Sequence, residues 1–167
     1  APLKKGRRAE ELEQFALNDS MTGMYNRNAY DYFVKNEKDF EGYVIVTFDL
    51  NNLKQCNDQY GHRAGDEYII NAAHIIEDNF ERYGKCYRIG GDEFCCIIPK
   101  GRYFKIERVM HKIDQDVEIL NHKNIIPVPV GIAYGYAVFT ADDTDPEKVR
   151  ERADKDMYRN KKTMKQS

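Results

Sequence analysis

Several features common in membrane-bound and nucleic-acid-binding proteins are missing from this sequence. No apolar run approaches the ~20 residues of a membrane-spanning helix, and no secretory signal is recognisable. Lys and Arg number 26 against 28 Asp and Glu, so a net charge of −2 leaves no basic excess to hold a nucleic acid. Repeats and low-complexity tracts are absent too. We expect a cytoplasmic domain that contacts neither a membrane nor nucleic acid.

The four cysteines are not spaced like the ligands of a zinc site. Cys56, Cys86, Cys95 and Cys96 include no C-x-x-C pair. The adjacent pair should point to opposite faces of a strand, because successive side chains alternate there. We predict four reduced thiols.

The length of 167 residues and the hydrophobic content of 41% fit one domain whose core needs no disulfide bonds. The chain begins at Ala1 and continues through a charged stretch, so we expect a piece of a longer protein. Residues 1–18 are predicted to be the end of a connecting helix. Their apolar spacing is compatible with a signal-transmitting coiled coil or with a short packed helix.

Hydrophobic spacing predicts helices and strands in mixed order. The run 43–48 is apolar on both faces, which is typical of a central strand covered on both sides. Helices are predicted at 26–40, 64–80, 102–121 and from Pro146 onward, and further strands at 85–89, 94–98 and 128–139. This order, which mixes crossovers with hairpins, predicts an α+β fold with a mainly antiparallel central sheet flanked by helices.

Acidic residues stand at two points where chemistry is expected. Asp49 follows the central strand, and Asp92 and Glu93 follow Gly90-Gly91, a pair suited to the positive φ angles of a tight hairpin turn. If the fold brings these acids together, they form a site for a hard divalent cation. A strand-end cap and a solvated turn remain the alternatives at this point.

Four separated motifs resemble, in order, the GGDEF domain of diguanylate cyclases. They are the entry segment 19–27, the block 48–66, the turn 90–94 preceded by Arg88, and the helix 153–161. The match runs from about residue 19 to residue 165. The resemblance implies a fold like that of nucleotidyl cyclases and polymerase palm domains, which is ferredoxin-like, with residues 19–167 as the catalytic domain.

The activity implied by this resemblance is the condensation of two GTP molecules into cyclic di-GMP and two pyrophosphates. The reaction needs Mg²⁺ or Mn²⁺ and a homodimer, in which each copy of the domain holds one GTP. An upstream sensory region in the full-length protein is implied as well, and the full-length protein is either free or anchored to a membrane.

The resemblance also implies roles for individual residues. The implied metal ligands are Asp49, the Leu50 carbonyl group and Asp92; the implied catalytic residues are Asp92, Glu93 and Lys54. Guanine would be read by Asn57 and Asp66, with His62 nearby, although His62 is equally interpretable as a structural histidine. The remaining implied substrate contacts are Asn52, Leu53, Gly90, Gly91, Lys161 and Lys165, the last of which replaces an Arg common in the family.

The sequence departs from the family pattern at two further places. Asn51 stands where a second aspartate is common, which removes one negative charge and weakens metal or substrate affinity at most. The stretch from Glu81 to Gly84 lacks the Arg and Asp of the R-x-x-D product-inhibition site, so we predict no feedback inhibition there. The retained Asp66 predicts a preference for GTP over ATP.

Two other functions compete with the cyclase. One is a non-catalytic module that binds GTP or senses a cyclic dinucleotide, for which a damaged turn motif is expected. The other is a small dimerising or partner-binding element, which would need no converging acids. The complete turn motif and the presence of Asp49 favour the enzyme.

Overall fold

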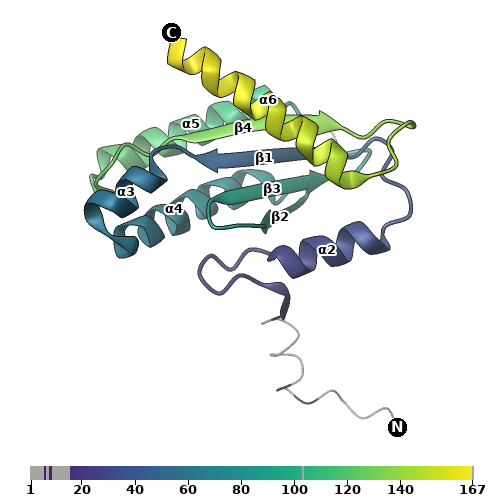
Figure 1. Ribbon diagram of the computed structural model, residues 1–167, viewed down its shortest axis with the longest axis horizontal. Helices are drawn as coiled ribbons and strands as arrows, with labels where there is room; N and C mark the ends of the chain where they lie inside the picture. The colour runs from purple at the N-terminus through teal and green to yellow at the C-terminus, as the bar shows by residue number, and fades with distance from the viewer. Residues whose placement is uncertain (1–5, 7, 9–15, 103, 167) are drawn as a thin grey trace.

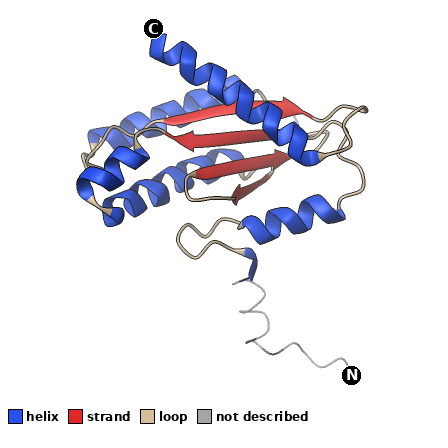
Figure 2. Ribbon diagram, viewed as in Figure 1, coloured by secondary structure: helices blue, strands red, loops and turns tan. Residues whose placement is uncertain are grey.

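The computed structural model describes the backbone of residues 6, 8, 16–102 and 104–166 and side chains as far as Lys161. The predicted connecting helix therefore falls largely outside the described residues. Figure 1 labels the elements and Figure 2 colours them by type: α2 (Arg27–Asn36), β1 (Val44–Leu50), α3 (Leu53–Tyr60), α4 (His62–Phe80), β2 (Lys85–Arg88), β3 (Glu93–Ile98), α5 (Ile106–His122), β4 (Ile132–Val138) and α6 (Pro146–Gln166).

The four strands form one sheet in the order β2-β3-β1-β4, and every neighbouring pair is antiparallel. The predicted α+β class with an antiparallel sheet is thus confirmed. The first strand is central, as its two-sided apolar pattern indicates.

Alternation along β1 divides the core into two clusters, one on each face of the sheet. Val46, Phe48 and Leu50 pack with residues of α3, α4 and α5, whereas Ile45 belongs to the cluster that includes residues of α2 and α6. In Figure 1, α4 and α5 lie behind the sheet and α6 crosses in front of it. Asp49 is four residues after Ile45 on the same strand, so its side chain points to the same face, the one that α6 covers.

The cysteine predictions hold within this core. Cys95 packs in the cluster on the α2 and α6 side and Cys96 in the opposite one, so the adjacent pair does point to opposite faces. All four thiols are free and buried. Burial raises the pKa of the Cys95 and Cys96 thiols above their ordinary value, which keeps them protonated.

Some predicted boundaries differ from the structure. α2 ends at Asn36 rather than Phe40, and a short helix, α3, occupies a stretch for which no helix was predicted. β4 begins at Ile132 rather than 128, because its partner β1 ends at Leu50 and the segment before it contains Pro127 and Pro129, which have no amide hydrogen for a ladder. No helix in the described part of the chain is long and apolar enough to cross a membrane.

Candidate active site

The register of the sheet brings the two acidic points together. Asp49 is the Cα partner of Glu93 in the β1–β3 ladder, and Asp92 directly precedes Glu93. These three acids line one pocket of about 250 Å³, whose other side is formed by α6 residues that include Arg150 and Asp154. Desolvation raises the pKa of Asp154 above its ordinary value. The convergence expected from the sequence is therefore present.

The glycine turn is built differently from the predicted hairpin. Neither Gly90 nor Gly91 has a positive φ angle. The Glu93 carbonyl accepts from the N–H groups of both Ile89, at 2.9 Å, and Gly90, at 3.4 Å, and without positive φ angles this turn is not the type I′ or II′ turn of a tight hairpin. Gly90 instead gives room to a side chain, because a Cβ there would lie 3.2 Å from a carboxylate oxygen of Glu93.

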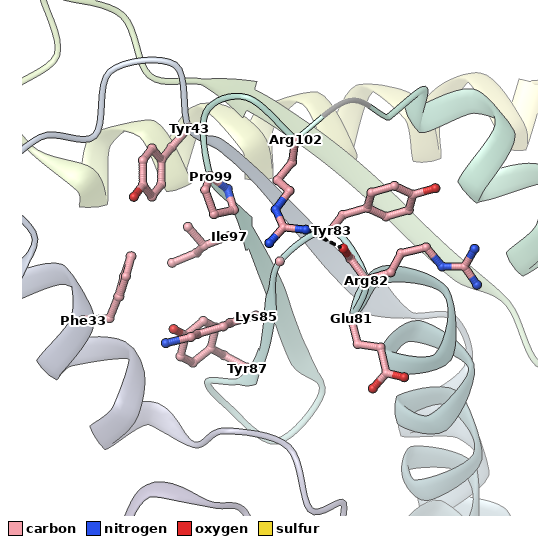
Figure 3. Close-up of a pocket in the computed structure, with 11 residues that line it drawn as sticks. Phe33, Tyr43, Glu81, Arg82, Tyr83, Lys85, Tyr87, Ile97, Pro99 and Arg102 are labelled. Atoms are coloured by element: carbon pink, nitrogen blue, oxygen red, sulfur yellow. Dashed lines mark hydrogen bonds between the residues drawn. The ribbon is translucent and has the colours of Figure 1, made fainter.

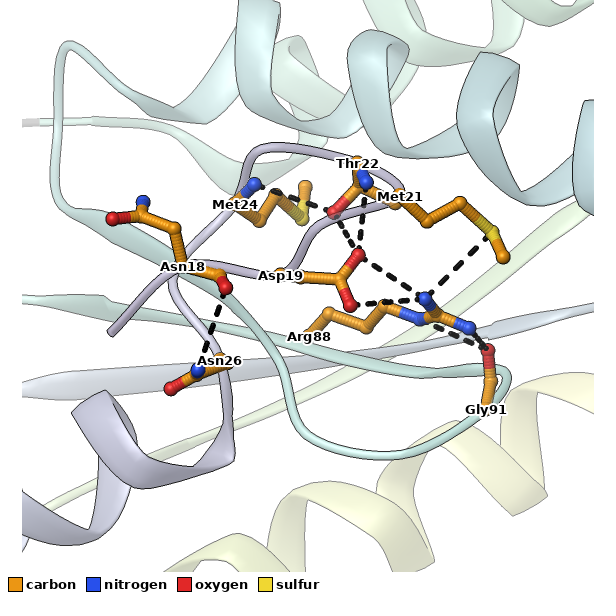
Figure 4. A network of polar contacts seen from close by, with 8 residues as sticks. All are labelled: Asn18, Asp19, Met21, Thr22, Met24, Asn26, Arg88 and Gly91. Carbon is orange, nitrogen blue, oxygen red and sulfur yellow. Dashed lines mark hydrogen bonds and ion pairs between the residues drawn. The ribbon is translucent and has the colours of Figure 1, made fainter. Parts of the chain in front are cut away.

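Arg88 ties this turn to the entry segment of the domain. Its Nη1 atom lies 3.1 Å from both carboxylate oxygens of Asp19, and its Nη2 atom donates to the Gly91 carbonyl at 2.9 Å (Figure 4). Partial burial acts to raise the pKa of Asp19, but hydrogen bonds from Thr22 and Arg88 outweigh it and hold this pKa below its ordinary value. The contact between Asp19 and Arg88, which are 69 positions apart in the sequence, thus holds the turn that carries Asp92.

Asp49 already accepts two hydrogen bonds. The Leu50 N–H donates to Oδ1 at 3.0 Å, and the Lys161 ammonium group of α6 donates to Oδ2. Lys161 therefore lies beside the acids. Lys165 continues along the same helix, but its side chain is outside the described part of the structure.

The donor set fits a divalent cation that binds together with a phosphate. Among the described residues no three His, Cys, Asp or Glu side chains are close enough to hold a metal by themselves. Mg²⁺ is commonly bound by one or two carboxylates plus substrate phosphates and water. Asp49, the Leu50 carbonyl group and Asp92 meet that description without forming an all-protein cage.

The turn between β1 and α3 leaves the first amide groups of α3 without a side-chain cap. Asn52 has a left-handed conformation, with φ 66° and ψ 14°, and its side chain makes no capping hydrogen bond with α3. The first amide groups of a helix without such a cap can bind an anion. Leu53 begins the helix and is buried, and Lys54 is exposed in its first turn. Sequence periodicity missed this feature because α3 has only eight residues.

The two implied guanine contacts lie on the packed pair α3 and α4. Asn57 belongs to α3, and its Oδ1 atom would be 1.7 Å from a Cβ added at Gly65, the α4 residue before Asp66. Gly65 therefore makes room for the Asn57 side chain, a role that the sequence motif alone does not reveal. His62 is exposed at the first position of α4.

A second pocket, of about 340 Å³, lies at the segment where the product-inhibition motif is missing (Figure 3). Aromatic side chains of Phe33, Tyr43 and Tyr87 form much of its wall. Glu81 and Gly84 line it as well. Glu81 stands where the motif has its arginine, and Gly84 stands where the motif has its aspartate.

The family assignment follows from a direct match. The model of the diguanylate cyclase GGDEF domain matches residues 16–167. The chain belongs to the GGDEF-domain family.

Curated relatives and solved structures agree with this assignment. Diguanylate cyclase DgcS of Shewanella oneidensis is 29% identical over 166 residues, which are 96% of this chain and 54% of that protein. The bifunctional diguanylate cyclase/cyclic di-GMP phosphodiesterase MucR of Pseudomonas aeruginosa is 30% identical over 89% of this chain and 22% of its own length. The chain thus spans about half or less of these relatives.

The fold is shared with structures of low sequence identity. The GGDEF domain of DgcB from Caulobacter crescentus, solved in complex with c-di-GMP, has a TM-score of 0.74 at 24% identity and covers 89% of this chain and 91% of that one. Diguanylate cyclase SiaD from Pseudomonas aeruginosa, solved with its activator SiaC, has a TM-score of 0.75 at 24% identity. The match covers 92% of this chain and 61% of that one.

Proposed function

We propose that this domain is a diguanylate cyclase, which joins two GTP molecules into cyclic di-GMP with release of two pyrophosphates. The observation that carries the proposal is the register pair of Asp49 and Glu93, which gathers Asp49, Asp92 and Glu93 in one pocket beside Lys161. Relatives that match nearly the whole chain include a protein named as a diguanylate cyclase.

The residues of the chain divide the chemistry between them. In each half-reaction the 3′-oxygen of one GTP bonds to the α-phosphorus of the other, and the bond from that phosphorus to the pyrophosphate oxygen breaks. Glu93 or Asp92 accepts the proton of the 3′-hydroxyl. The backbone at Asn52 and Leu53 receives the β- and γ-phosphates, and Lys54 and Lys161 offset their charge.

A divalent cation held by Asp49, the Leu50 carbonyl and Asp92 would supply charge neutralisation at the phosphates and a lower pKa of the attacking hydroxyl group. Asn57 and Asp66 read guanine, because a carboxylate accepts from N1–H and the exocyclic amine, an arrangement that adenine does not offer. GTP should therefore be used and ATP should not. Comparable turnover of the two nucleotides would contradict this part of the proposal.

The active species is a homodimer, because one domain carries one GTP and therefore half of the reacting groups. At low concentration the rate should rise more steeply than linearly with protein concentration. A strictly linear dependence down to nanomolar protein would contradict the dimeric mechanism.

The decisive experiment is incubation with GTP and Mg²⁺ followed by mass analysis for cyclic di-GMP. The native chain should form the product, and Asp92→Ala should not. If GTP binds but neither the native chain nor an artificially dimerised form makes product, the domain is a GTP-binding or cyclic-dinucleotide-sensing module instead. The relative PdeR of Escherichia coli, 30% identical over 93% of this chain, is named as a phosphodiesterase, so this outcome has to be tested.

A further inference from the structure

A buried tyrosine lies directly beneath the β1–α3 turn. Tyr68 of α4 is fully buried, and its hydroxyl group is 2.6 Å from the Asn51 carbonyl oxygen. The same hydroxyl accepts a hydrogen bond from the Gly131 N–H at 2.9 Å and lies 3.1 Å from the Gly131 carbonyl. Position 68 is outside the residues that carry the family resemblance, so nothing in those motifs requires a tyrosine here.

The hydroxyl closes the end of the sheet where β1 turns into α3. The last pair of the β1–β4 ladder is Leu50 with Ile132. One further backbone bond follows it, in which the Asn51 N–H donates to the Gly131 carbonyl at 2.8 Å. Tyr68 engages the remaining groups of this extra pair: the carbonyl of Asn51 and the amide of Gly131. Because a hydroxyl has one hydrogen and two lone pairs, it can donate to the first and accept from the second at the same time.

The next residue shows why this anchor matters. Asn52 adopts a left-handed conformation, which is uncommon for residues other than glycine, although asparagine tolerates it better than most. Its side chain reaches the Pro129 carbonyl only at 3.5 Å and does not cap α3. Within the described structure the Asn51 backbone is held on both sides, by the Gly131 carbonyl at its N–H group and by the Tyr68 hydroxyl at its carbonyl oxygen.

We propose that Tyr68 is a positioning residue for nucleotide binding, whose hydroxyl group holds the turn from Leu50 to Leu53 in the conformation that receives the triphosphate. The inference rests on the proposed function, since it assigns this turn to the phosphates of GTP. A tyrosine that only fills the core would contribute to stability and leave nucleotide affinity unchanged.

The test compares two variants that each remove one buried hydroxyl group. Tyr68→Phe removes the anchor, whereas Tyr30→Phe removes the hydroxyl that bonds Glu147 at 3.0 Å on the opposite face of the sheet. The dissociation constant of guanosine 5′-[α,β-methylene]triphosphate with Mg²⁺ is measured by calorimetry well below the unfolding temperature of each protein. Tyr68→Phe should weaken binding about tenfold, and Tyr30→Phe by less than twofold. Equal affinity for Tyr68→Phe and the native chain would overturn the proposal.

Hydrogen exchange separates this inference from the proposed function. In Tyr68→Phe without nucleotide, the amides of Asn51 and Cys56, which donate to the Gly131 and Asn52 carbonyls at 2.8 and 2.9 Å, should exchange at least tenfold faster, while those of α5 keep their rates. If the native chain binds no nucleotide, the proposed function fails, and unchanged exchange at the turn would then overturn the positioning role too. If Tyr68→Phe does not fold, hydrogen exchange of the native chain still tests the anchor. Its Gly131 amide must exchange far more slowly than an exposed turn amide, and rapid exchange would contradict the anchor.

Discussion

The Lys161 ammonium group of α6 donates a hydrogen bond to Oδ2 of Asp49, although 112 residues separate them in the sequence. The side chains are 27% and 26% exposed, so the pair lies at the rim of the acidic pocket rather than in the core. A cation is thereby held next to the carboxylate that the family resemblance implies as a metal ligand. This contact links the docking of α6 to the chemistry of the site.

Replacement of Lys161 should impair activity much more than stability. A partly exposed ion pair contributes about 1 kcal/mol or less to folding, so Lys161→Met should unfold at nearly the same urea concentration as the native chain. A charge-assisted hydrogen bond to phosphate contributes about 1.5–3 kcal/mol, so kcat/KM for GTP should fall about ten- to hundredfold. Lys148→Met, which removes an exposed lysine at the other end of α6, is the control. A kcat/KM within twofold of native would show that Lys161 does not act on the substrate.

Asp19→Asn should change how stability depends on pH. The pKa of Asp19 is lowered in the folded state, so its ionised form stabilises the fold above the unfolded-state pKa of about 3.9. This contribution is lost as pH falls through the folded-state pKa. The variant should therefore be less stable than the native chain at pH 6, and the difference between their free energies of unfolding should become smaller toward pH 3. Urea unfolding at pH 6 and pH 3 measures this difference. A difference that does not depend on pH would contradict a lowered pKa of Asp19.

Gly65→Ala should reduce nucleotide affinity without destabilising the domain. Alanine is the better helix former by about 1 kcal/mol, which favours α4. A Cβ at position 65 would lie 1.7 Å from the present position of the Asn57 side-chain oxygen, so the Asn57 side chain would have to move. We expect about tenfold weaker binding of GTP by calorimetry. The helical signal in circular dichroism should be unchanged. Affinity equal to that of the native chain would mean that Asn57 does not read guanine.

Cyclic di-GMP should not inhibit the proposed cyclase activity through the segment Glu81 to Gly84. Glu81 and Gly84 stand where the product-inhibition motif has its arginine and aspartate, and the other charged residues of the pocket, Arg82, Lys85 and Arg102, are outside that register. The initial rate should stay within about twofold of its starting value when micromolar cyclic di-GMP is added. A marked fall that Glu81→Gln deepens, together with product bound in this pocket, would contradict the prediction.

Local patterns in the sequence were sufficient for most elements and for the residue types of the site. Hydrophobic spacing predicted the helix at 102–121, and the apolar residues that carry this spacing are buried in α5: Ile106, Val109, Ile113, Val117 and Leu120. The two-sided apolar run before Asp49 predicted the central strand. Helical and strand periods are repeated over neighbouring residues, so they can be recognised without knowledge of the rest of the fold. The turn at Gly90-Gly91 was mispredicted because its geometry depends on where the two strands stop pairing.

The sequence by itself determined the antiparallel α+β class, the family and the identity of the acids. Only the tertiary structure decided that Asp49 pairs with Glu93, that Lys161 bonds Asp49, that Gly65 accommodates Asn57 and that the Tyr68 hydroxyl bonds the Asn51 carbonyl. Most of these contacts join residues far apart in the chain, and they follow from sheet register and from the way each helix packs on the sheet. Both depend on the packing of the whole core at once, which no local pattern encodes.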